Sequence, residues 1–214
     1  MTYYRVVILS TNLQPFFIVQ SDPDGKGIPY FMDKHWTPEL PDYEFYDSPP
    51  CEGDFLTAYS LKAKTYQLNG DYLVDENLVS NEMLYLCEKL NIKCIRIPVD
   101  INLHRGVRPQ KKYFLFFPLS YLSILDKDES TYTISIDLDS GKLNTQEERG
   151  LKKTYYESID KFKIKNNIRE HLFFCNEIAA SVCSIQFKNE YEALGLTGVS
   201  FKEINDNYQY SAWS

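Results

Sequence analysis

The sequence lacks a long apolar run. Near the N-terminus only Val6 to Leu9 is continuously apolar, which is shorter than the core of a secretory signal peptide. The longest apolar stretch, Tyr113 to Leu125, is interrupted by Pro118 and is too short to cross a bilayer as a helix. We therefore expect a cytoplasmic protein that has no membrane partner.

Cysteine and histidine are sparse and irregularly spaced. The five cysteines are an odd number, and the three histidines lie far from one another, so neither a disulfide framework nor a structural zinc site is expected. Cys87 and Cys183 fall in apolar helix and strand patterns and are predicted to be small buried hydrophobes. We expect all five cysteines to be buried free thiols, and we expect no cofactor.

Motifs for nucleotide binding, nucleophilic catalysis and calcium binding are missing. Gly25-Lys26-Gly27 lacks the third glycine of a dinucleotide fingerprint, and Gly198 to Lys202 lacks the closing glycine of a nucleophile elbow. The Asp137 to Gly141 stretch departs from the spacing of a calcium loop and is interpreted as a solvated turn. No small-molecule substrate is indicated, although a dispersed catalytic set, such as Cys51 with His35, stays open because it would carry no motif.

Basic residues are rare in the first 60 positions. There, nine Asp or Glu meet three Lys or Arg, while the whole chain has a formal charge of −7. An acidic surface repels nucleic acid and attracts basic partners. We therefore expect no nucleic-acid partner.

Aromatic residues are abundant, with 17 Tyr and 13 Phe, and 43% of the chain is hydrophobic. Short strand patterns dominate and helical spacing is brief, so the predicted fold is α+β, with an antiparallel or mixed sheet and a few short packed helices. Predicted strands include Arg5–Leu9, Phe16–Val19, Thr131–Leu138 with its alternate residues Tyr132, Ile134, Ile136 and Leu138 facing the core, and Ile95–Val99, placed near a sheet edge because of Pro98. Residues 119–125 are predicted to be helical.

The chain divides into residues 1–60, a strand pair with an acidic aromatic extended segment, and residues 61–214, the main α+β body, with a single domain as the alternative. Within the body, one helix-turn-strand unit is repeated. A shift of 104 positions carries Ser80 onto Ser184 and Asn91 onto Gly195. Serine is a good helix N-cap, and Asn and Gly tolerate the left-handed conformation that ends a helix. The alternative is that any amphipathic helix followed by a strand has this pattern.

The stretch from Glu39 to Asp54 has six carboxylates and no Lys or Arg. Its prolines restrict the unfolded chain and favour binding in an extended form. The candidate partner-binding residues are Glu39, Asp42, Tyr43, Glu44, Tyr46, Asp47, Glu52 and Asp54. The alternative is an ordinary acidic loop whose aromatic side chains, Trp36 and Phe55 among them, belong to the core.

Four motifs in a fixed order carry a resemblance to a known class of proteins. They are Glu52-Gly53-Asp54-Phe55-Leu56, Leu78-Val79-Ser80-Asn81-Glu82-Met83, the stretch 121–130, and Leu194-Gly195-Leu196-Thr197-Gly198-Val199-Ser200-Phe201. Over residues 40–205 the chain resembles the bacterial polymorphic-toxin immunity proteins of families eleven and forty-three, whereas the first 35 residues match no pattern.

The resemblance implies an immunity protein of a contact-dependent or secreted-toxin system. Its partner would be a cognate toxin, a nuclease or other intracellular poison, held by tight binding. No catalytic residues come with the resemblance. An unrecognised enzyme and an accessory protein of a toxin secretion system are the alternatives.

Overall fold

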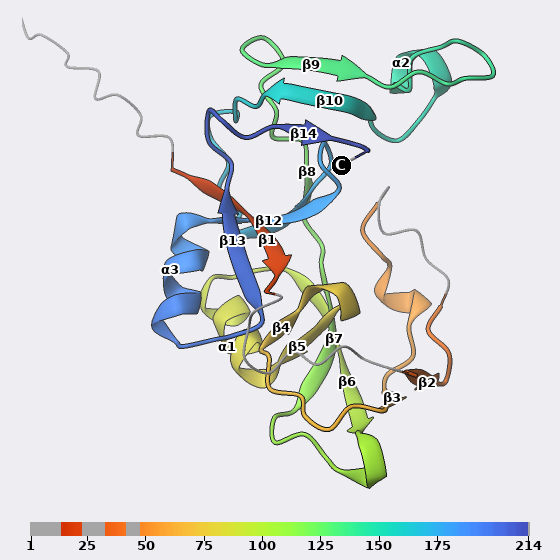
Figure 1. Ribbon diagram of the computed structural model, residues 1–214, viewed down its shortest axis with the longest axis vertical. Helices are drawn as coiled ribbons and strands as arrows, with labels where there is room; N and C mark the ends of the chain where they lie inside the picture. The colour runs from red at the N-terminus through yellow and green to blue at the C-terminus, as the bar shows by residue number, and fades with distance from the viewer. Residues whose placement is uncertain (1–13, 23–32, 42–47, 214) are drawn as a thin grey trace, which may run out of the picture.

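The computed structural model describes residues 14–22, 33–41 and 48–213, and within them the chain forms three sheets and three short α-helices (Figure 1). The first sheet has the order β13-β1-β12-β11-β8, made of β1 (Phe16–Ser21), β8 (Tyr121–Leu122), β11 (Leu172–Cys175), β12 (Ala180–Ser184) and β13 (Val199–Glu203). The second has the order β2-β3-β6-β7-β5-β4, made of β2 (His35–Thr37), β3 (Tyr59–Lys62), β4 (Tyr72–Leu73), β5 (Leu78–Ser80), β6 (Cys94–Asn102) and β7 (Tyr113–Pro118). The predicted α+β class is confirmed.

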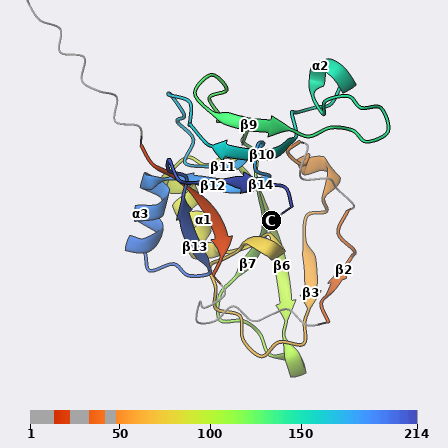
Figure 2. The same cartoon turned by 45° about the horizontal axis from the view of Figure 1, so that its top comes forward.

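A smaller third sheet has the order β14-β10-β9, made of β9 (Thr131–Ile134), β10 (Tyr156–Lys161) and β14 (Tyr210–Ser211), and turning the molecule brings it forward (Figure 2). The helices are α1 (Asn81–Lys89), α2 (Gln146–Arg149) and α3 (Ile185–Ala193), with 3-10 turns η1 (Glu52–Asp54), η2 (Val74–Glu76) and η3 (His104–Gly106). No helix in the described ranges is long and apolar enough to cross a bilayer.

The apolar strands β1 and β7 are buried on both faces. In β7, Leu115 and Phe117 join one core cluster, whereas Phe116 joins a second that includes the buried side chains of α1 and α3. In β1, Phe17 joins this second cluster, while Ile18 joins a third between the first and third sheets. Successive strand residues point to opposite faces, so a continuous apolar run is what a strand between two cores requires.

The two nine-residue helices, α1 and α3, begin and end in the same way. Ser80 Oγ accepts a hydrogen bond from the Met83 amide at 3.1 Å, and Ser184 Oγ accepts one from the Phe187 amide at 3.2 Å. These are N-caps, as predicted.

At the other end Asn91 and Gly195 have φ of 54° and 65°, which confirms the predicted left-handed termini. The Ile92 and Leu196 amides then donate back to the carbonyls of Cys87 and Tyr191, closing a Schellman motif in each helix.

The repeat extends to the topology. β5, α1 and β6 form a strand-helix-strand unit in which β7 lies between the two strands and is antiparallel to both. β12, α3 and β13 form the second unit, with β1 antiparallel between them. Each unit is a split β-α-β motif. The two helices lie side by side, joined by an ion pair of 2.6 Å from Lys89 Nζ to Glu190 Oε2 (Figures 1 and 2).

The predicted strand Thr131–Leu138 is too long. β9 ends at Ile134, and the chain turns where Asp137 accepts hydrogen bonds from the backbone and hydroxyl of Ser140. Ile136 is therefore 52% exposed and Leu138 97% exposed, so neither is a core residue. Alternation continues into a turn here, and period-2 spacing alone does not reveal where pairing stops.

The helix predicted over residues 119–125 is also wrong. Tyr121–Leu122 forms β8, parallel to β11, and Leu125 makes an isolated bridge with Ile164. The Glu177 carboxylate accepts hydrogen bonds from the amides of Ile124 and Leu125, which holds the segment extended.

β6 is not an edge strand, because it lies between β3 and β7. The parallel pairing with β3 starts at Val99, one residue after Pro98, so the missing amide falls outside it. The predicted strand Arg5–Leu9 lies outside the described residues.

Candidate functional site

Three of the predicted partner-binding carboxylates lie at one end of the second sheet. β2 runs antiparallel to β3 with Thr37 opposite Ser60, so Glu39 lies where β3 begins. Glu52 and Asp54 belong to η1, which precedes β3, and all three side chains are exposed. We call Glu39, Glu52 and Asp54 the acidic end.

The aromatic side chains beside the acidic end belong to the core. Phe55 is 9% exposed and stacks on Phe117 with ring centroids 5.0 Å apart. Trp36 packs edge-on against Tyr59 at 6.4 Å and contacts the same core cluster. Phe55 and Trp36 therefore fit the alternative interpretation of this segment, an acidic loop whose aromatic side chains belong to the core. Leu56, 55% exposed, is the apolar surface that remains next to Asp54.

The other predicted partner-binding residues fall within positions 42–47, outside the described residues. They are Asp42, Tyr43, Glu44, Tyr46 and Asp47.

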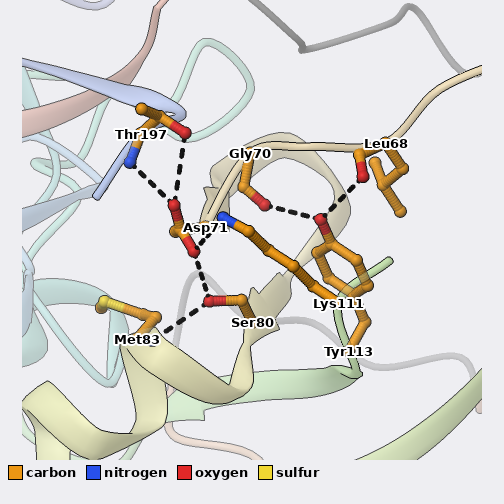
Figure 3. A network of polar contacts seen from close by, with 8 residues as sticks. All are labelled: Leu68, Gly70, Asp71, Ser80, Met83, Lys111, Tyr113 and Thr197. Carbon is orange, nitrogen blue, oxygen red and sulfur yellow. Dashed lines mark hydrogen bonds and ion pairs between the residues drawn. The ribbon is translucent and has the colours of Figure 1, made fainter. Parts of the chain in front are cut away.

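A buried carboxylate, Asp71, was not singled out in the sequence. It is 1% exposed, and its Oδ1 accepts hydrogen bonds from Ser80 Oγ at 2.6 Å and Lys111 Nζ at 2.7 Å (Figure 3). Its Oδ2 accepts from the Thr197 amide at 3.0 Å and the Thr197 hydroxyl at 3.3 Å. A buried charge needs such partners to offset its desolvation.

The Asp71 network joins the two split β-α-β units. Ser80 caps the helix of the first unit, and Thr197 precedes the last strand of the second. Next to Thr197, Gly198 has φ of 116°, and a Cβ there would lie 2.4 Å from the Tyr72 carbonyl oxygen. The Leu-Gly-Leu-Thr-Gly motif is therefore structural: it ends α3, binds Asp71 and allows close backbone approach. Because Ser80 and Asp71 are buried, this network serves folding rather than chemistry on a partner.

A second buried carboxylate, Glu177, is also engaged in structure. Besides the amides of Ile124 and Leu125 at 3.2 Å, its Oε2 accepts from Cys175 Sγ at 3.2 Å. Burial, reinforced by this carboxylate, raises the pKa of the Cys175 thiol well above its usual value.

All five cysteines are free, and three of them, Cys87, Cys175 and Cys183, are buried, as predicted for Cys87 and Cys183. Burial raises the pKa of the Cys87 and Cys183 thiols, which keeps both protonated at neutral pH. The expectation of buried thiols is wrong for Cys51, which is exposed, and Cys94 is partly exposed. The three buried thiols are inert packing groups.

The described side chains include no group of three or more His, Cys, Asp or Glu that could hold a metal ion. The buried side chains of Asp71, Ser80, Glu177 and Ser184 are used in capping and in joining elements, and the charged side chains of the acidic end face solvent.

Comparison with known proteins identifies the class. Residues 20–206 match the model of an immunity protein family, so this is an immunity protein, a class that is typically not enzymatic and that implies a cognate toxin as its partner. The family is Imm11, and because the match covers most of the chain, the chain belongs to it. A search of curated proteins found no match. The family match starts nearer the N-terminus than the motifs indicated.

Proposed function

We propose that this protein neutralises one cognate toxin in the cytoplasm by occupying the toxin's active site or substrate surface. The toxin is a nuclease or another intracellular poison. The surface that contacts the toxin consists of the acidic end together with Asp42, Tyr43, Glu44, Tyr46 and Asp47.

The observation that carries this proposal is the exposure of three carboxylates at one end of a sheet, in a member of an immunity family. An enzyme that acts on a polyanion presents a basic surface, and carboxylates are the complementary charge. Buried thiols held protonated and buried carboxylates engaged in structural bonds support a mechanism that depends on binding. Inhibition by occupancy needs no chemical step.

Association kinetics with the cognate toxin domain test the surface. Charge reversal of the acidic end (Glu39→Lys, Glu52→Lys, Asp54→Lys) removes electrostatic attraction, so the association rate should fall by about tenfold or more at low salt and vary less with salt. The dissociation rate should change less, because exposed charges steer the encounter more than they hold the complex.

The matched control reverses three exposed carboxylates elsewhere, Asp128→Lys, Glu129→Lys and Asp160→Lys, for the same change in net charge. If the two triple variants associate equally fast, the interface lies elsewhere. If neither they nor the wild-type protein bind the toxin, the proposed function itself is wrong.

A further inference from the structure

A cluster of exposed cations lies at the other end of the second sheet, in a protein of net charge −7. The cluster, which we call the basic tip, consists of Lys62, Lys64, Arg105, Arg108 and Lys112, and all five side chains are exposed. Lys62 ends β3, Lys64 follows it, and the other three belong to the turn between β6 and β7, at the bottom of Figure 1. Residues 101–125 contain no Asp or Glu.

The charge of the basic tip is only partly neutralised within the described chain. Arg108 pairs with Asp100, and Lys64 pairs with Asp33 at 2.6 Å. Both pairs are largely exposed and hence weak. Lys62, Arg105 and Lys112 form no ion pair with any described carboxylate. Positive charge therefore remains available to a partner.

The backbone under the basic tip is held in place. The amide of Ala63 donates to the backbone carbonyl of Asn102 at 3.0 Å, and the amide of His104 donates to the backbone carbonyl of Thr65 at 2.9 Å. These bonds join the segment after β3 to the turn after β6. Within the turn, the Leu103 amide donates to Val107 at 2.8 Å. A surface that is ordered before binding loses less conformational entropy in a complex.

An exposed aromatic side chain lies in the same place. Tyr66 is 65% exposed, and its ring lies against His104 in a tilted arrangement, with centroids 4.7 Å apart and an interplanar angle of 57°. Beside it, Val107 is 48% exposed. Tyrosine and arginine are among the residues that contribute most of the binding energy in protein interfaces.

We infer that the basic tip is a second interaction surface, which binds an acidic patch on the same toxin. This inference rests on the proposed function. The acidic end lies where β3 begins and the basic tip where β3 ends, so the two surfaces have opposite charge at opposite ends of one sheet. A partner with the reverse arrangement is held in a single orientation, since the flipped pose brings like charges together.

The observations favour an acidic protein surface over nucleic acid. Asp33 and Asp100 lie within the cluster, and the net charge of the whole chain is negative, which opposes a phosphate backbone at long range. The family match points to the toxin as the occupant, because an immunity protein implies a cognate toxin as its partner. A second copy of this chain, turned end for end, would also bring opposite charges together in a closed dimer, so the test below includes self-association as an outcome.

The test measures binding of two variants to the purified, inactivated cognate toxin domain. Reversing Arg105→Glu, Arg108→Glu and Lys112→Glu should slow association at least about tenfold at low salt, and the difference from wild type should shrink in about 0.5 M salt. Tyr66→Ala should leave association nearly unchanged and speed dissociation at least about tenfold.

Two controls match these variants. Lys127→Glu, Lys142→Glu and Lys161→Glu give the same change in net charge from exposed sites elsewhere, and Tyr85→Ala removes another exposed tyrosine, on α1. Thermal unfolding should show all variants folded.

Three results would overturn the inference. The first is wild-type toxin kinetics in both tip variants. The second is binding of the wild-type protein to a 20-nucleotide single-stranded RNA, if the triple reversal of the basic tip abolishes that binding and the control variants do not. The third is concentration-dependent self-association that the same reversal abolishes. In each case the proposed function would still hold if the wild-type protein binds the toxin. If the wild-type protein does not bind the toxin, both the proposed function and this inference are wrong.

Discussion

Gly195 and Gly198 are three residues apart and are glycine for different reasons. Both have positive φ, but a Cβ at Gly195 would meet nothing within 4 Å, whereas a Cβ at Gly198 would lie 2.4 Å from a backbone oxygen. The first position requires only a left-handed conformation, and the second also requires the absence of a side chain.

Replacing each glycine by alanine separates these two requirements. Gly195→Ala should lower the free energy of unfolding by about 1 kcal/mol, the cost of a left-handed non-glycine residue. Gly198→Ala should cost about 2 to 4 kcal/mol, because the backbone of β4 must also move. Urea denaturation of both variants measures the difference. If the two substitutions lower the free energy of unfolding equally, the backbone of Gly198 does not approach Tyr72 closely.

Among the secondary-structure elements, the two helix-capping serines differ in the side chains to which they hydrogen-bond. Ser80 Oγ caps α1 and donates to the buried carboxylate of Asp71, while Ser184 Oγ caps α3 and lies 2.9 Å from Nδ1 of the partly buried His171. Only Ser80 therefore supports a buried negative charge.

Ser80→Ala should consequently be the more damaging of two equivalent substitutions. Loss of a cap costs about 1 kcal/mol, and loss of a hydrogen bond to a buried charge adds about 1.5 to 3 kcal/mol. We expect about 2.5 to 4 kcal/mol for Ser80→Ala and about 1 to 2 kcal/mol for Ser184→Ala, measured by urea denaturation. A larger loss in Ser184→Ala would show that Asp71 is satisfied without Ser80.

The sequence predicts those elements whose ends are set by local chemistry. The serine caps and the Asn91 and Gly195 termini depend on residues within one turn, and all were found as predicted. Residues 119–125 depend on Glu177, more than 50 positions away, and their extended form was missed. Phe16–Val19 was predicted as a strand, but the placement of β1 and β7 between the members of each split unit is set by packing at long range and was not predicted.

The candidate site divides in the same way. The acidic end was visible because its carboxylates are close in sequence. Asp71 was missed because its partner Thr197 lies 126 positions away, and the only local signal was the proximity of Asp71 to the capping Ser80. The basic tip needed the structure, since Lys62 and Arg105 are brought together by the pairing of β3 with β6.

In the molecule as a whole, one buried and one partly buried tyrosine link stability to alkaline pH. Burial raises the pKa of both Tyr121 and Tyr208 to about 12, against about 10 in an unfolded chain. Below pH 10 both states keep the proton, so this contribution to stability is fully present. Between about pH 10 and 12 the unfolded state loses protons that the folded state retains, and the free energy of unfolding must fall.

Urea denaturation at intervals from pH 8 to 11.5 should show this fall, with phenolate absorbance at 295 nm rising together with unfolding. The double variant Tyr121→Phe and Tyr208→Phe should show a shallower fall. An identical pH dependence in the two proteins would contradict the raised pKa values.

Inhibition by occupancy requires one immunity protein for each toxin molecule. A titration of the activity of the cognate toxin with purified immunity protein, at a toxin concentration well above the dissociation constant, measures this stoichiometry. We predict a linear loss of toxin activity that ends at one equivalent, because each molecule bound silences one toxin. Complete protection by a small fraction of an equivalent would contradict the account, since it would require the protein to turn over.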